Sequence, residues 1–217
     1  MVRENYTQQL ESVKGDLSEL GNMVCEMLTL SSTCLLRGGK KCHRDVVSME
    51  AKAKRRFLAL EEKCLRMLAR QQPVASDLRF ITSALHAARK LERCGSYASD
   101  ISQTAMLLGN RVNSGLPEIR QMTESAEAAV RISVRGFVEK DMQLSPEVSK
   151  LEVETDGQLR ELLEKLKTEA QKGRSHTEVA FRTYMISKYL ERAADNAVRI
   201  THATGYMVTG DRKYLLD

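Results

Sequence analysis

The same short segment occurs late in each half of the 217-residue chain, as Leu91-Glu92-Arg93 and again as Leu190-Glu191-Arg192. Ile101 and Ile200 follow the two copies at the same distance. Two matching segments at corresponding places indicate one structural module that is used twice. Because the shared residues include a Glu-Arg pair, which belongs on a helix surface, the repeat carries chemistry as well as packing.

Apolar residues recur at helical spacing through the whole chain, and no stretch alternates for long enough to predict a β-strand. Aromatic residues make up 5% of the sequence and only 3 residues are proline, so little interrupts long helices. The pattern predicts six helices, three in each half. They cover approximately residues 6–36, 42 or 46 to 70, 76–108, 118–140, 145–172 and 175–208.

Turn-forming residues mark the ends of these helices. Two glycines at 38–39 end the first helix, and Pro73 follows the second. Either Ser76 or Asp77 is predicted to cap the third helix, and Ser175 with Glu178 forms a predicted capping box for the sixth.

The sharpest boundary is Asn113-Ser114-Gly115-Leu116-Pro117, close to the midpoint of the chain. We therefore expect an all-α protein of two tandem three-helix bundles, related by internal duplication and built as up-down bundles with short connections. The first repeat covers residues 1–112 and the second 117–210, with a joint at 113–116. The two bundles pack either side by side or end to end.

The charge of the chain is mildly basic, with a net charge of +5 and a pI near 9.0. Basic residues alternate with acids except in a turn from Arg37 to Arg44 and in a short run from Lys52 to Arg56. This favours solvated helix faces and predicts no nucleic-acid partner, because such binding needs basic clusters focused on one face. Two interpretations of the basic turn stay open, a solvated loop or a contact site for an anionic partner. No run of about 18 apolar residues predicts a membrane span.

The 5 cysteines all fall in the first half, at spacings that build neither a disulfide framework nor a zinc site. We therefore predict reduced, mostly buried thiols in a cytoplasmic protein.

Acidic residues near the repeated segment form rows on the helix surface. Glu191 and Asp195 lie one turn apart, and Glu92, Ser96 and Asp100 occupy the matching row of the first half. Such rows offer hard oxygen ligands to a divalent cation.

The second and fifth predicted helices should face these rows. Glu152 and Asp156 form a further acidic pair in the second half, whereas the first half offers Glu50 followed by Lys54. Ser96 and Lys54 therefore weaken the predicted first-half site, since fewer negative charges face the ion. Arg199 dilutes the second-half site in the same way.

Two other interpretations compete with a metal-binding regulator. The acidic rows of a metal-free scaffold would be solvated faces that pair with arginines. A ferritin-like di-iron enzyme needs Glu-x-x-His pairs, and the residues three positions before the histidines are Lys40, Ser83, Gly173 and Arg199. The di-iron chemistry is therefore disfavoured, and we predict that the chain is not an enzyme.

A longer segment, Gln71-Gln72-Pro73-Val74-Ala75-Ser76-Asp77-Leu78-Arg79, precedes the first repeated segment, and the second copy continues as Tyr189-Leu190-Glu191-Arg192-Ala193-Ala194-Asp195. Together with the duplication and the midpoint joint, these runs resemble the PhoU family of phosphate-uptake regulators over essentially the whole chain. The resemblance maps the family's Glu-x-x-x-Asp metal motif onto Glu92 with Ser96 and onto Glu191 with Asp195. It implies bound divalent or iron-type metal ions.

The resemblance also implies a regulatory role. Proteins of this family couple a phosphate ABC transporter ATPase to a two-component sensor histidine kinase and damp the phosphate-starvation response. It further implies a cytoplasmic homodimer or higher oligomer that reaches the membrane only through its partners. A metal-free interaction protein for a related anion transporter is the alternative.

Overall fold

A computed structural model describes residues 2–37, 40–111 and 116–215, and α-helices dominate it. Short 3-10 turns follow three of the helices, at Gly109–Arg111 (η1), Met142–Leu144 (η2) and Arg212–Leu215 (η3). The long helices are α1 (Val2–Arg37), α2 (Lys40–Gln71), α3 (Ala75–Leu108), α4 (Leu116–Glu139), α5 (Ser145–Ala170) and α6 (Arg174–Thr209).

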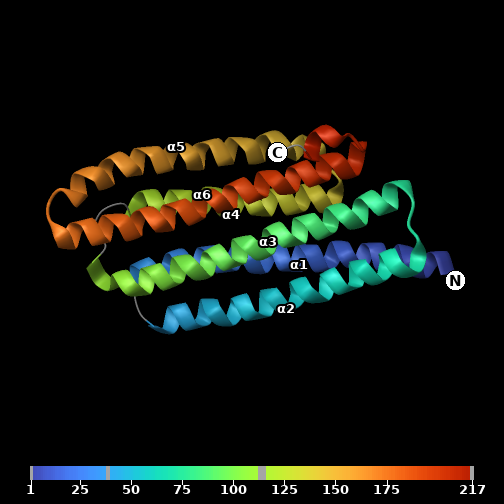
Figure 1. Ribbon diagram of the computed structural model, residues 1–217, viewed down its shortest axis with the longest axis horizontal. Helices are drawn as coiled ribbons and strands as arrows, with labels where there is room; N and C mark the ends of the chain where they lie inside the picture. Colours follow the sequence, from blue (N-terminus) through green and yellow to red (C-terminus); the bar gives the residue numbers. More distant parts are fainter. Residues whose placement is uncertain (1, 38–39, 112–115, 216–217) are drawn as a thin grey trace.

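The helices run along one long axis and form two three-helix bundles packed side by side (Figure 1). Helices α1, α3, α4 and α6 occupy the middle, where each bundle contacts the other. Helix α2 packs on α1 and α3 along one edge, and α5 packs on α4 and α6 along the opposite edge. The predicted all-α fold with two related bundles is therefore confirmed. Of the two arrangements that the sequence left open, side by side or end to end, the structure has the first.

The most extensive contact in the described structure joins α3 and α6, which run antiparallel. Their meeting point lies within the duplicated segment. The Cys94 thiol is 3.7 Å from the carbonyl oxygen of Ala193, its counterpart in the other repeat, at a separation of 99 residues. An antiparallel contact between equivalent positions means that a pseudo-two-fold axis relates the two bundles at this point. Cys94 and Ala193 are both small and fully buried, which allows the two helices to approach closely here.

The helix limits agree with the predictions to within a few residues, but the predicted N-caps of two helices do not. The N-cap of α3 is Val74 and that of α6 is Gly173, and neither has a side-chain cap hydrogen bond. The predicted capping roles of Ser76, Asp77 and Ser175 are therefore wrong. At α6 the hydroxyl of Thr177 instead donates to the carbonyl oxygens of Ala170 and Gly173 and joins the end of α5 to α6.

The prediction that all thiols are reduced is wrong for one pair. Cys34 and Cys42 form a disulfide with a Cα–Cα distance of 5.6 Å, which joins the end of α1 to the start of α2. Cys25, Cys64 and Cys94 are free and buried, as expected, and burial raises the pKa of each thiol to about 12. The sequence spacing did not indicate this disulfide, because Cys34 and Cys42 come close only where the chain reverses between α1 and α2.

Two predicted features fall partly outside the described residues. Residues 38–39 of the basic turn and 113–115 of the joint are not described, while Lys40 and Leu116 are the first residues of α2 and α4. No helix in the described part of the chain is both long and apolar enough to cross a membrane.

Packing at the pseudo-two-fold axis is testable with Ala193→Leu. Overfilling this fully buried position should lower the free energy of unfolding by about 1–3 kcal/mol, and the melting temperature by roughly 2–12 °C. Ala59→Leu, at an exposed position of α2, is the matched control and should leave the melting temperature nearly unchanged. Equal effects of the two variants in a thermal denaturation experiment would contradict a tight α3·α6 contact.

Candidate functional site

Four carboxylates from α5 and α6 form what we call the second-half acidic patch, made of Glu152, Asp156, Glu191 and Asp195. Each pair lies one helical turn apart on its own helix, and α5 packs against α6 along its length. All four residues are half-buried. The structure therefore places the predicted second-half residues within electrostatic reach of one another.

The crowding of these carboxylates changes the pKa of Glu152. Burial raises the pKa of its carboxyl, and the negative charges of Asp156, Asp195 and Glu191 raise it further. A cation placed among several carboxylates stabilises their ionised forms. The patch therefore has a local excess of negative charge on a chain whose net charge is positive.

Basic side chains neutralise part of this charge. Asp156 pairs with Arg160, and Asp195 lies 3.5 Å from Nε of Arg199. Nζ of Lys188 lies 2.8 Å from Oε2 of Glu191, but the approach has no hydrogen-bond geometry, so this buried oxygen lacks a hydrogen-bond partner. A buried acceptor without a donor is costly, and a cation or a reoriented ammonium group would satisfy it.

The corresponding first-half patch is depleted. Glu50 of α2 and Asp100 of α3 are close enough to interact, because the pKa of Asp100 is raised first by burial and then by Glu50. Glu92 belongs to the same row of α3, but Ser96 separates it from Asp100, and Lys54 is exposed. The first-half residues thus occupy the predicted face without forming a concentrated acidic site.

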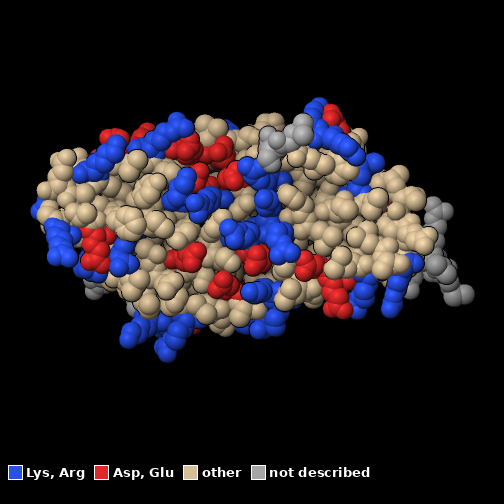
Figure 2. Space-filling model, in the orientation of Figure 1, with Lys and Arg blue, Asp and Glu red and all other residues tan. Residues whose placement is uncertain are grey.

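A band of basic side chains separates the two acidic regions. Figure 2 shows Lys and Arg gathered over the middle of the face that α3 and α6 share, with acidic clusters on both sides of it. Burial lowers the pKa of the His86 imidazole, and the positive charges of Lys90 on α3 and Arg199 on α6 lower it further. Arg93 adds a cation above the Tyr97 ring at 5.6 Å, and that ring stacks on Tyr189 across the α3·α6 contact at 5.9 Å. This face therefore alternates in charge from acidic to basic to acidic.

The donor set fits a metal ion in the second half only. Four carboxylates, one of them with an unpartnered oxygen, are the hard ligands that divalent cations prefer. Within the described residues, however, the side chains as they stand bring no three of the His, Cys, Asp and Glu groups together closely enough to hold an ion. The carboxylates are instead paired with Lys188, Arg160 and Arg199. Metal binding would require these basic side chains to move away from them. The first-half set, with Ser96 and Lys54, does not fit.

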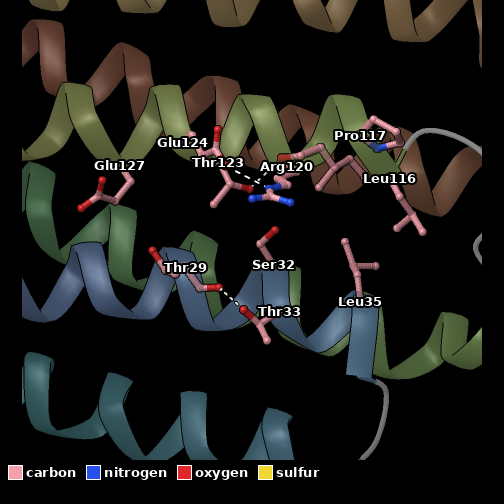
Figure 3. Close-up of a pocket in the computed structure, with 11 residues that line it drawn as sticks. Thr29, Ser32, Thr33, Leu35, Leu116, Pro117, Arg120, Thr123, Glu124 and Glu127 are labelled. Atoms are coloured by element: carbon pink, nitrogen blue, oxygen red, sulfur yellow. Dashed lines mark hydrogen bonds and ion pairs between the residues drawn. The ribbon is translucent and has the colours of Figure 1, made fainter.

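Sequence reasoning missed a cavity between α1 and α4, on the other side of the central layer. It has a volume of about 550 Å³ and is lined by hydroxyl groups such as Ser32 and by apolar residues such as Leu35 and Ile119. Figure 3 shows Arg120 between the two helices, where its Nε lies 3.0 Å from Glu124. The charged groups that line the cavity are already paired with one another or with a neighbouring arginine. The gap between two helices of different bundles could not be read from either helix alone.

Comparisons with known proteins agree with this architecture. Residues 17–105 and 119–204 each match the family model described as PhoU domain. A homologue from Synechocystis, named as a phosphate-specific transport system accessory protein, is 28% identical over 97% of this chain and 94% of its own length. Another of the same name from Clostridium acetobutylicum is 25% identical over the full length of both chains.

Solved structures resemble the fold closely. The crystal structure of PhoU from Pseudomonas aeruginosa superposes with a TM-score of 0.89 at 25% identity, over 95% of this chain and all of that one. The phosphate transport system regulatory protein PhoU from Streptococcus pneumoniae, at 20% identity and a TM-score of 0.87, shares the fold. Because the family domain occurs twice and covers most of its length, this chain belongs to the PhoU family.

Proposed function

We propose that this protein is a regulatory adaptor of a phosphate ABC transporter, which docks on the transporter ATPase and on a sensor histidine kinase and so restrains phosphate uptake and the phosphate-starvation response. The names of its relatives, which are accessory and regulatory proteins of phosphate transport, support this role. In this proposal the protein is a cytoplasmic binding module and not an enzyme. It reaches the membrane only through its partners.

The observation that carries the proposal is the charged face of α3 and α6 (Figure 2). Arg93 and Arg192 are both exposed there and come from the duplicated Leu-Glu-Arg segment. A surface whose charge alternates in sign suits docking, because complementary charges set orientation and exclude wrong partners. The stacked Tyr97 and Tyr189 rings provide a rigid base beneath it.

A metal ion belongs to this proposal as a regulatory or structural ligand of the second-half acidic patch. Glu152, Asp156, Glu191 and Asp195 would hold it, and it would neutralise the charges that oppose each other there. The bound ion would free Lys188 and Arg199 from their carboxylates and so change the charge presented beside the basic band. The metal-free scaffold remains the competing form of the same adaptor, since Arg160, Lys188 and Arg199 already neutralise part of the patch.

Metal binding is tested by elemental analysis of the tag-free protein, prepared without chelators, beside the double variant Glu191→Gln/Asp195→Asn. We expect a stoichiometric divalent or iron-type ion in the wild type and at least a ten-fold weaker affinity in the variant, since even outer partners of metal ligands cost that much. Glu61→Gln/Glu62→Asn on α2 is the control and should retain the metal. A folded wild-type protein that binds no ion would favour the metal-free scaffold.

The crowding of carboxylates has a separate consequence for stability. The folded-state pKa of Glu152 is raised, so its ionised form costs stability above that pKa, and the cost disappears as the pH falls below the ordinary glutamate pKa of 4.5. Glu152→Gln should therefore raise the melting temperature at pH 7 in chelator, and this gain should vanish near pH 4. Glu154→Gln, which removes a carboxylate 3.7 Å from Lys150 on the same helix, should give no gain. A gain that does not depend on pH would refute the electrostatic explanation.

Docking is tested by binding of the purified protein to the transporter ATPase and to the cytoplasmic part of the sensor kinase from the same organism. Arg93→Glu/Arg192→Glu should weaken binding to at least one partner by ten-fold or more, because like charges then face the partner's acids. Arg120→Glu lies in the α1·α4 cavity away from this face and is the matched control. Unchanged affinity in the double variant would place docking elsewhere, and no affinity of the wild type for either partner would overturn the adaptor role.

A further inference from the structure

The disulfide between α1 and α2 distinguishes the first repeat from the second. Cys34 lies near the end of α1 and is bonded to Cys42 in the first turn of α2, at a separation of 8 residues. The other cysteines are free and buried, and their raised pKa values keep these thiols protonated and unreactive near neutral pH. Thiol chemistry in this protein is therefore concentrated where α1 meets α2.

The duplication shows what stands in place of this bond in the other repeat. The buried positions of α1 and α2 match those of α4 and α5 at one constant offset, as Leu20 with Met122 and Val46 with Val148. In this register the bonded cysteines correspond to Gly136 and Leu144. A Cβ atom placed on Gly136 would lie 3.7 Å from the Cβ of Leu144, which is close to the usual Cβ separation across a disulfide. The two positions are thus neighbours in both repeats, and the second repeat closes this turn without a covalent bond.

The two repeats also begin their outer helices differently. The first turn of α2 contains Lys40 and Lys41 and no acidic residue, so positive charges lie where the helix dipole favours negative ones. Helix α5 instead begins with Pro146 and has Glu147 in its first turn, and both residues favour a helix start. The first repeat therefore has a covalent bond at a helix start that its own sequence disfavours.

The two sulfur atoms of the bond differ in their exposure. Cys34 is 2% exposed, whereas Cys42 is only partly buried. An incoming thiolate therefore reaches Sγ of Cys42, forms a mixed disulfide there and releases the Cys34 thiolate, which takes up a proton. A second thiol then attacks the mixed disulfide and releases Cys42 as a thiol. The protein gains two electrons and two protons, the two external thiols become one disulfide, and the reverse steps restore the bond.

We propose that Cys34 and Cys42 form a reversible redox modification site, which exchanges electrons with a thiol–disulfide couple and so controls whether the first turn of α2 is ordered. The intact bond holds Cys42 against the buried end of α1. After reduction, the unfavourable charges of Lys40 and Lys41 act on a helix start that is no longer covalently fixed, and this turn frays.

The effect of reduction is confined to the start of α2. Nδ1 of His43 lies 2.9 Å from Oγ of Ser102 on α3, and Val46 is fully buried, so the helix beyond these residues stays in place. The modification site lies at one end of the molecule (Figure 1), whereas the basic band lies over the middle of the face that α3 and α6 share (Figure 2). The redox site is therefore independent of the adaptor role, and both of its tests use the isolated protein.

Counting of reactive thiols tests the bond and its reversibility. Protein that is equilibrated with glutathione disulfide and then denatured should react with an alkylating reagent at 3 cysteines. Treatment of the folded protein with dithiothreitol should raise the number to 5, and renewed exposure to glutathione disulfide should lower it again. Cys64→Ala, on the same helix as Cys42, is the matched control and should show one thiol fewer in each state.

Two results of this titration would overturn the proposal. The first is a folded protein in which all cysteines stay reactive after oxidation, because the bond then does not form. The second is a bond that dithiothreitol does not reduce until the protein is denatured, because the disulfide is then a permanent structural link.

Hydrogen exchange tests the consequence for α2. The amide hydrogens of residues 44–46 bond to carbonyl oxygens of the first turn, and they should exchange about ten-fold faster or more in the reduced protein, since a disulfide usually stabilises by at least that factor. The amides of residues 149–151, at the start of α5, should exchange equally in both states. Cys34→Ala/Cys42→Ala should exchange at the fast rate in either buffer. Equal rates in the two states of the wild type would refute the proposed control of α2.

A charge reversal tests why the turn depends on the bond. Lys40→Glu/Lys41→Glu places negative charges at the start of α2, and it should reduce the difference between the two redox states by about three-fold or more. Lys52→Glu/Lys54→Glu changes two exposed residues in the middle of the same helix and should leave the difference as it is. A difference that both variants leave unchanged would contradict a helix start that is weakened by its own charges.

Discussion

The contact between α3 and α6 is the constraint on which the rest of the molecule depends. Cys94 and Ala193 meet at equivalent positions of the two repeats, and small residues around them allow the helices to approach closely. A large side chain here would separate the bundles and the two rows of acids together. The same residues that duplicate the module therefore also join it to its copy, which explains why the repeated segment combines small apolar residues with charged ones.

Close packing at this contact determines what the surface can present. Because the apolar sides of α3 and α6 are buried, the charged residues of the Leu-Glu-Arg segments lie at the surface, with the arginines exposed and the glutamates half-buried. Figure 2 shows Lys and Arg side chains over the middle of the face that α3 and α6 share, with acidic clusters on both sides. Opposite charges therefore occupy separate strips, and a cation bound in one strip alters the field felt in the next, which lies within a Debye length.

The sequence predicted much of this arrangement because helical periodicity and turn residues are local signals. The limits of α4 and the end of α6 before Gly210 agree with the pattern, and α5 faces the acidic row of α6, so that Glu191 raises the pKa of Glu152. What it could not predict depends on contacts between segments. Val74 and Gly173 begin helices without side-chain caps, Cys34 meets Cys42 only because the chain reverses, and the α1·α4 cavity exists only between two bundles.

The two repeats share a fold but have diverged in complementary ways. The second repeat keeps four acids between α5 and α6, while the first has replaced part of its set with Ser96 and Lys54. Helix α2 also exposes Leu58, where the equivalent position of α5 is Arg160. Once a duplicated module is held together by its central contact, each outer helix is free to change, because it packs on only one bundle. The two edges of the molecule therefore present different surfaces, with the second-half acidic patch beside α5 and exposed apolar residues along α2.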